Sequence, residues 1–154
     1  MKSSLTVGLL CWLGFVLNAA ALPSNLDGDP PFGTSKHFAW AQNAGWVNGQ
    51  PFGYTDTGVE VTSLTVSGIA WAQNLGWVQF GDGTPNSGLR YSNTSATDCG
   101  VNIVDWRGNL GGYAWSQNAG WINFGWAAAN DTNRPRFNFS THAFEGYAWA
   151  QHLG

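Results

Sequence analysis

Short stretches of alternating apolar and polar residues, separated by turn residues, run through the chain from residue 37 onward. One phrase recurs there, with Ala-Trp before a polar pair and Gly-Trp after it. Its copies are Phe38–Asn48, Ile69–Phe80, Tyr113–Phe124 and a partial copy, Tyr147–Gly154. The Asn-x-Gly segment between the two apolar stretches is a turn signal, because Asn tolerates left-handed backbone angles and Gly adopts them without steric cost. Each copy therefore predicts a β-hairpin.

The hydrophobic pattern also suggests a register for these hairpins. With Asn118-Ala119 as a two-residue loop, Trp115 pairs with Ile122, and opposed residues share a face of the hairpin. This register predicts one apolar face per copy, formed in the third copy by Tyr113, Trp115, Ile122 and Phe124. The first Trp of every copy is then expected in the core: Trp40, Trp71, Trp115 and Trp149. The second Trp falls on the other face, where it packs on the facing Ala or stands exposed: Trp46, Trp77 and Trp121.

A further strand precedes the hairpin in three copies, at Val59–Val61, Val101–Ile103 and Phe137–Phe139. The unit is then a small antiparallel meander, and several units must combine to bury their apolar faces. We expect an all-β fold of repeated hairpins and meanders that form a sandwich or a barrel-like sheet assembly. A β-propeller or a solenoid is the rival architecture, although the copies are few and unevenly spaced for either.

The start of the chain predicts export. Lys2 precedes an apolar run from Leu5 to Leu17, and small residues before Leu22 form a cleavage signal, so residues 1–21 are expected to be a secretory signal peptide. The run is shorter than the roughly 20 residues that a membrane span needs, so we expect no transmembrane span in the mature chain. Residues 22–36 then form a linker and residues 37–154 the β-repeat domain. The fourth copy is cut within its turn, so we expect a fragment of a chain that continues with Trp, Ile or Val, and a polar residue.

Composition narrows the function. Only 10% of the 154 residues are charged, the formal net charge is −3, and seven of the ten Trp lie in the repeated phrases. Such a surface cannot neutralise phosphates, so no nucleic-acid partner is expected. The nine carboxylates do not recur at a fixed position of the repeat, and no serine elbow or phosphate loop is present. The sequence therefore predicts a protein that is not an enzyme.

Histidine offers the remaining candidate chemistry. His142 and His152 lie ten residues apart, and His152 stands where the other copies have Asn. Two imidazoles on neighbouring strand ends suit copper or zinc, and His37 beside the first hairpin is a third candidate ligand. Each of these residues can equally be an ordinary polar loop residue.

The phrase Gly-Tyr-Ala-Trp-Ser-x-Asn-x-Gly-Trp-Ile-x-Phe, at Gly112 to Phe124, resembles a repeat of secreted bacterial surface proteins. It is similar to that of the copper-repressible, surface-associated copper-binding proteins of methane-oxidising bacteria, the MopE/CorA type. The resemblance implies copper held by two histidines and a Trp oxidised to kynurenine, with one histidine two residues after that Trp. The three complete copies instead have Asn48, Gln79 and Asn123 there, so no kynurenine is assigned.

Two functional hypotheses follow. The first is a secreted, cell-surface-associated, non-enzymatic protein that binds copper for acquisition through His142, His152 and His37. The alternative is an extracellular adhesion or carbohydrate-binding module, in which Trp46, Trp77 and Trp121 stack on polysaccharide or on cell-surface components. Exposure of these three Trp side chains is required by the second hypothesis and not by the first.

Overall fold

Antiparallel strands make up the regular structure of the chain. The computed structural model describes residues 37–51, 58–95 and 97–153, so the expected signal peptide, the linker and Gly154 lie outside the described residues. Every regular element within these ranges is a strand, which confirms the all-β prediction. The strands are β1 (Phe38–Ala41), β2 (Gly45–Asn48), β3 (Val59–Val61), β4 (Thr65–Ala72), β5 (Gly76–Gly81), β6 (Val101–Ile103), β7 (Leu110–Ser116), β8 (Gly120–Asn123), β9 (Arg136–Asn138), β10 (Ala143–Glu145) and β11 (Trp149–Ala150).

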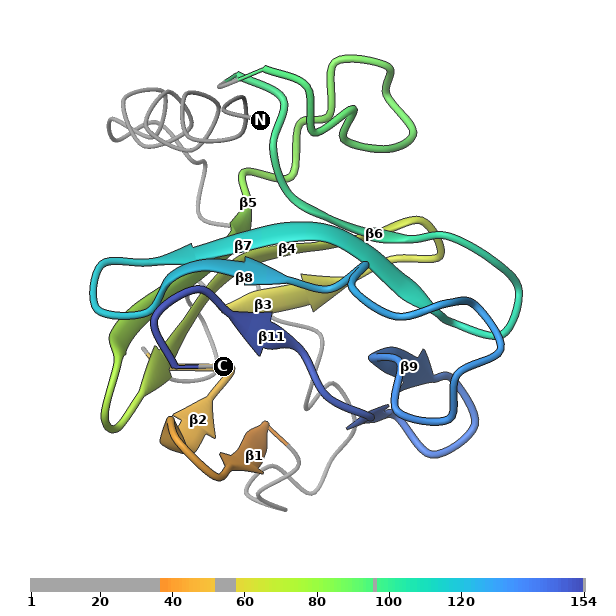
Figure 1. Cartoon of the computed structure of the whole chain (residues 1–154). Coiled ribbons are helices and arrows are strands. Elements are labelled where there is room, and N and C mark those ends of the chain that lie inside the picture. Colours follow the sequence, from red (N-terminus) through yellow and green to blue (C-terminus); the bar gives the residue numbers. More distant parts are fainter. Residues whose placement is uncertain (1–36, 52–57, 96, 154) are drawn as a thin grey trace, which may run out of the picture.

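The three complete copies of the phrase form the hairpins β1–β2, β4–β5 and β7–β8, and the partial copy contributes β11. These strands pair in the order β1-β2-β4-β5-β7-β8-β11, and the sheet curves into part of a ring (Figure 1). Each unit meets the next in the same register, because Asn48 pairs with Trp71 and Asn123 pairs with Trp149. The curved sheet fits the barrel-like alternative of the sequence prediction.

Asn side chains at the hairpin tips link neighbouring units. Asn118 donates through Nδ2 to the carbonyl oxygen of Leu75 at 3.1 Å, which joins the third tip to the second. Asn43 donates in the same way to the carbonyl oxygen of Leu153 at 3.3 Å, so the first tip is joined to the fourth. Asn74 Nδ2 donates to the carbonyl oxygen of Asn43, and the backbone N–H of His152 donates to that of Ala119, so the ring of tips is continuous from the last unit back to the first.

The strands before the hairpins form a second tier of the structure. β3 pairs with the first half of β4, and β6 pairs with the first halves of both β4 and β7. β9 and β10 form a separate two-stranded sheet, joined to the rest by a bridge between Asn109 and Arg136. The three expected leading strands are confirmed, with β9 displaced by one residue. The largest fully buried apolar side chains of this tier and of the strand halves paired with it are Val59, Val66, Val101, Ile103 and Leu110.

Glycine allows the chain to pass from one tier to the other. Gly68 in β4 and Gly112 in β7 have φ values of +85° and +84°, where side chains cause strain. A Cβ atom on Gly112 would overlap the carbonyl oxygen of Gly100 on the preceding segment, and one on Gly68 would overlap that of Gly58. Both glycines lie three residues before the first Trp of their copy, so the repeated sequence specifies the bend.

The register predicted for the hairpins is wrong by one residue. Trp115 pairs with Trp121 rather than with Ile122, and Ser116 pairs with Gly120. The loop therefore has three residues, with Gly120 at φ +70°, the left-handed position that follows a type I turn in such loops. The same pairing joins Trp71 to Trp77 and Trp40 to Trp46.

Placement of the first Trp of each copy in the core is consequently also wrong. Trp40, Trp71 and Trp149 are exposed and Trp115 is half-buried. The inward face instead carries small side chains on the first strand of each copy, opposite larger apolar side chains on the second strand: Ala70 faces Val78, and Ala114 faces Ile122. Its buried members include Ala70, Ala72, Val78, Ala114, Ser116 and Ala150.

Candidate binding surface and cleft

Paired tryptophans cover the outer face of the ring. Trp40 and Trp46 have ring centroids 5.3 Å apart, and the equivalent distance is 4.9 Å in both the second and the third hairpin. All three pairs meet edge to face, the arrangement that the charge distribution of aromatic rings favours. The fractional exposures of these side chains decide whether the rings are accessible to a ligand. They are 64% for Trp40, 54% for Trp46, 43% for Trp71, 45% for Trp77 and 47% for Trp149, whereas Trp115 and Trp121 are half-buried.

Amide side chains lie between the Trp pairs. Asn48, Gln79 and Asn123 occupy outward positions directly opposite the first Trp of the next copy, and all three are half-buried. The other outward positions of the hairpins hold Phe38, Ile69 and Tyr113, so the face formed by these strands is aromatic and uncharged. We call this set the tryptophan face: Phe38, Trp40, Trp46, Asn48, Ile69, Trp71, Trp77, Gln79, Tyr113, Trp115, Trp121, Asn123 and Trp149.

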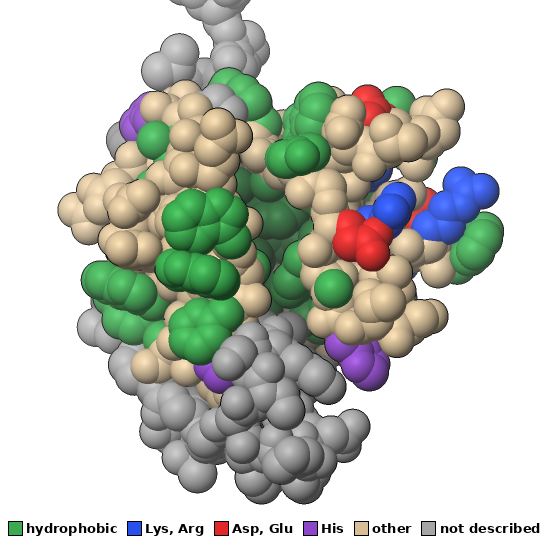
Figure 2. All heavy atoms as spheres, turned by 90° about the horizontal axis from the view of Figure 1, so that it is seen from below, with side chains coloured by type: hydrophobic (Ala, Val, Ile, Leu, Met, Phe, Trp, Pro, Cys, Tyr) green, Lys and Arg blue, Asp and Glu red, His purple; other side chains and the backbone are tan. Residues whose placement is uncertain are grey.

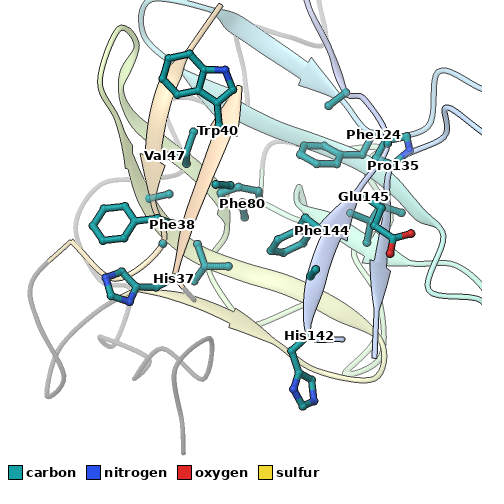
Figure 3. Close-up of a pocket in the computed structure, with 18 of the residues that line it drawn as sticks. His37, Phe38, Trp40, Val47, Phe80, Phe124, Pro135, His142, Phe144 and Glu145 are labelled. Carbon is teal, nitrogen blue, oxygen red and sulfur yellow. The ribbon is translucent and has the colours of Figure 1, made fainter. Parts of the chain in front are cut away.

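An apolar cleft opens into the ring between β1 and the segment that leads through β10 to β11. Figure 2 shows bulky hydrophobic side chains on the surface beside a hollow that is itself lined with hydrophobic side chains. The cleft has a volume of about 500 Å³. Phe80, Phe124 and Phe144 reach toward its centre from three different strands or strand ends (Figure 3). The centroids of Phe80 and Phe124 lie 5.9 Å apart.

The predicted metal ligands do not form one cluster. His37 and His142 line the cleft from opposite sides, with His142 in the β9–β10 turn at φ +54° (Figure 3). His152 lies at the hairpin tips and does not line the cleft; its backbone N–H donates to the carbonyl oxygen of Ala119 at 3.1 Å. Among the described residues, no group of three or more His, Cys, Asp or Glu side chains could hold a metal ion.

Two carboxylates with lowered pKa values, those of Asp98 and Asp105, organise loops. Burial of Asp98 raises its pKa, but hydrogen bonds from Ser92 and Asn86 outweigh this effect, so its pKa lies below the ordinary value. Asp105 has a lowered pKa for the same reason: hydrogen bonds from Asn109 and Arg107 outweigh the effect of burial. Both carboxylates therefore fix the backbone around them.

Tyr91 anchors the long loop between β5 and β6. Its hydroxyl accepts a hydrogen bond from the backbone N–H of Gly83 at 2.6 Å, and burial is the main cause that raises its pKa. The backbone of Tyr91 also exchanges two hydrogen bonds with the side chain of Asn102. This loop stands apart from the tryptophan face, at the top of Figure 1.

Sequence reasoning missed the pairing of Trp with Trp and the cleft. A three-residue loop, Gln117 to Ala119, followed by a left-handed Gly would have predicted the pairing, because it brings the two Trp of each copy opposite one another. The cleft has no local signal, since its walls come from β1, the middle of the ring and the β9–β10 turn.

The comparisons with known proteins leave the family open. No family model matches the sequence, and no curated protein or solved structure is significantly similar to it. In the described ranges, the structure contains no helix with the length and apolar character required to cross a membrane.

Proposed function

We propose that the chain is a non-enzymatic extracellular binding module whose tryptophan face stacks on the sugar rings of a neutral polysaccharide. The observation that carries this proposal is the outward position of both Trp of each hairpin and of Trp149 in the partial copy, with five of these seven side chains 43% to 64% exposed. An exposed aromatic surface of this extent is unusual for a protein with no partner. Pairing the Trp in the ladder fixes their orientation before any ligand binds, which reduces the ordering cost of binding.

The chemistry of the face favours a carbohydrate. The flat side of an indole packs against the C–H groups of a pyranose ring. Adjacent amides such as those of Asn48 and Gln79 can donate hydrogen bonds to sugar hydroxyl groups and accept hydrogen bonds from them. The strands of this face contribute no charged outward side chain, so a neutral polymer suits it better than an acidic one.

Binding to insoluble polysaccharides tests this proposal. We would measure depletion of the protein by microcrystalline cellulose, chitin and an insoluble β-1,3-glucan, with Trp71→Ala and Trp40→Ala as test variants. Loss of one stacking contact of about 0.5–1.5 kcal/mol should weaken binding roughly two- to tenfold. Trp106→Ala is the matched control, because Trp106 is 84% exposed in the β6–β7 loop, away from the face.

Two results would contradict the proposal. One is the absence of binding to all three polymers, and the other is an equal loss of binding in Trp106→Ala and Trp71→Ala. Circular dichroism of each variant verifies that the fold is retained, so that a loss of binding can be attributed to the missing ring.

Export of the chain is part of this proposal and rests on the sequence of residues 1–21. Expression in a host with a secretory pathway should deliver the protein to the medium or the cell surface. N-terminal sequencing should then give Leu22 as the first residue. Retention of Met1 on an intracellular product would contradict export.

A copper-binding role is the second candidate, and the observation that favours it is the presence of His37 and His142 at the same cleft. Two imidazoles can provide a linear or open copper site. Titration with copper(I) should give a site that is weakened by His37→Ala and by His142→Ala, with His152→Ala as the comparison. Binding that none of the three substitutions changes would remove this candidate.

A further inference from the structure

The two Trp rings of each exposed pair are far from coplanar. The ring planes of Trp40 and Trp46 make an angle of 72°, and those of Trp71 and Trp77 make an angle of 77°. Two rings at such an angle cannot both lie flat against one surface. When one ring stacks on the face of a sugar, the other stands beside that sugar as a wall. Each pair therefore forms a corner, which suits a single sugar chain better than the flat face of a polysaccharide crystal. We call Trp40 and Trp46 the first corner, and Trp71 and Trp77 the second corner.

Asn48 lies between the first corner and the second. It follows Trp46 by two residues on β2, so both side chains share the outward side of the strand, and it pairs with Trp71 of β4. Its Oδ1 accepts a hydrogen bond from the backbone N–H of Gln50 at 2.9 Å, which holds the amide in place. Within the described ranges its Nδ2 makes no hydrogen bond, so this group is available to a sugar hydroxyl at either corner. The two corners are thus separated by a hydrogen-bonding group and do not form one continuous aromatic strip.

The ring turns successive corners in different directions. Hydrogen bonds between the hairpin tips connect the four units into a closed ring. Four units around one ring turn the outward direction by about a quarter turn from each unit to the next. In Figure 1, the hairpins β1–β2 and β7–β8 accordingly lie below and above the interior of the ring. A straight chain that stacks on one corner therefore leaves the surface before it reaches the next corner.

We propose that the first and second corners are separate single-chain sites, through which one molecule of this protein binds two dispersed polysaccharide chains and cross-links them. This inference rests on the proposed polysaccharide-binding function and adds the form of the substrate, which is individual hydrated chains. The four Trp side chains of the two corners are 43% to 64% exposed, so both corners are accessible at once. Simultaneous use of two sites strengthens binding to a network of chains by about 10²–10⁴ without any new contact.

Agglutination of coated beads tests the cross-linking. The full 154-residue chain is mixed with latex beads that carry cellohexaose, chitohexaose or laminarihexaose, which match the three polymers of the binding assay. We expect the beads that carry the sugar of the bound polymer to agglutinate, and the free hexasaccharide to reverse this. Trp40→Ala/Trp46→Ala removes the first corner and Trp71→Ala/Trp77→Ala removes the second. Each double variant should need at least tenfold more protein for agglutination.

A matched control replaces two exposed side chains outside the tryptophan face. Leu89→Ala/Trp106→Ala changes loop positions that are 60% and 84% exposed, and it should agglutinate the beads like the unmodified chain. Equal weakening of agglutination in this control and in the corner variants would overturn the proposal.

The number of hexasaccharides bound per chain provides a readout that depends neither on the oligomeric state nor, for the unmodified chain, on the folding of a variant. Isothermal titration calorimetry should give more than one hexasaccharide per unmodified chain. Each double variant should bind one fewer, at unchanged affinity of the remaining sites. One hexasaccharide per unmodified chain, or loss of all binding when either corner is removed, would overturn the proposal, because both results describe a single continuous site.

The form of the substrate is tested with two preparations of the polymer that binds. We expect the dissociation constant to be at least tenfold lower for dispersed chains than for the crystalline polymer, because a flat crystal face meets one corner at a time. Equal or tighter binding to the crystalline polymer would overturn the inference. Binding to no polymer contradicts the proposed function itself, whereas binding without agglutination contradicts the cross-linking alone.

Discussion

Replacing Gly112 by Ala should destabilise the protein by more than the backbone strain alone. Gly112 has φ +84°, and a left-handed conformation costs an Ala residue roughly 1–2 kcal/mol. Its Cβ atom would in addition overlap the carbonyl oxygen of Gly100, a backbone atom that cannot rotate away. Forcing apart packed groups typically costs about 1–3 kcal/mol more. We therefore expect Gly112→Ala to lower the free energy of unfolding by about 2–5 kcal/mol.

Substitutions at two other glycines distinguish the cost of backbone strain from the cost of the steric overlap. Gly88 has φ +71° and no atom within 4 Å of its added Cβ, and Gly76 has φ +73° with its nearest neighbour at 3.8 Å. Gly88→Ala and Gly76→Ala should each lose only the roughly 1–2 kcal/mol of strain. Urea unfolding monitored by Trp fluorescence gives the free energy of unfolding of each of the three variants from the midpoint and slope of its transition.

The comparison has a clear refuting result. If Gly112→Ala and Gly88→Ala lose the same free energy, the close approach of the two backbones at Gly112 is not a real constraint on the fold. Gly68→Ala serves as the repeat of the experiment, because its Cβ atom would overlap the carbonyl oxygen of Gly58 in the same way. A large loss in only one of the two would show that the bends in β4 and β7 are not equivalent.

Three further predictions concern the tryptophan face and the loops. A double-mutant cycle on Trp71 and Trp77 should give a coupling free energy of about 0.5–1.5 kcal/mol in urea unfolding, and a value of zero would contradict the edge-to-face contact. Iodide should quench most of the Trp fluorescence of the folded chain, because most of these rings are exposed; protection comparable to that of a buried Trp would contradict the outward orientation. The folded-state pKa of Asp98 lies below its ordinary value of 3.8, so its contribution to stability is present above that value and is lost as the pH falls through the lower folded-state pKa. Asp98→Asn should flatten the stability profile in this acidic range, and an unchanged profile would show that Asp98 is not the responsible group.

The strand content was predictable because the repeat combines local signals. Val59–Val61 and Val101–Ile103 form strands with the expected bounds, since alternating β-branched residues next to turn residues favour strands regardless of the tertiary context. The positive φ expected of the tip glycines is also confirmed, with values of +71°, +73° and +70° at Gly45, Gly76 and Gly120. Local pattern was sufficient wherever the structure depends on a few neighbouring residues.

The orientation of the strands was not predictable in the same way. An Asn-x-Gly loop of two or three residues has almost the same sequence, but the two loops exchange the faces of one strand relative to the other. Choosing by hydrophobicity favoured Trp115 opposite Ile122, whereas in the assembled sheet Trp115 points outward and its neighbours Ala114 and Ser116 take the inward positions. The size of the interior is a property of the assembled sheet and is absent from any single copy.

The candidate metal ligands illustrate a related limit of prediction from the sequence. His152 departs from the Asn of the other copies, which suggested a ligand. In the structure its backbone N–H donates to Ala119, just as that of Asn74 donates to Ala44 at 3.0 Å. In both units the contact is made by the backbone N–H of this position, so His in place of Asn leaves the hydrogen bond between the tips intact. The placement of His37 and His142 on opposite sides of one cleft depends on the ring and could not be read from their distance in the sequence.

The contacts between hairpin tips make the ring independent of the segments that connect its units. The connection between β5 and β6 is much longer than that between β2 and β3, yet the hairpins on either side meet in the same register. Lengthening a flexible loop twofold costs only about 0.6 kcal/mol. The scaffold should therefore accept grafted peptide segments at Gly88, whose surroundings are open, while Tyr91 and Asp98 continue to hold the base of that loop. For a protein engineer, the ring is a support on which a new recognition loop can be displayed without redesigning the sheet.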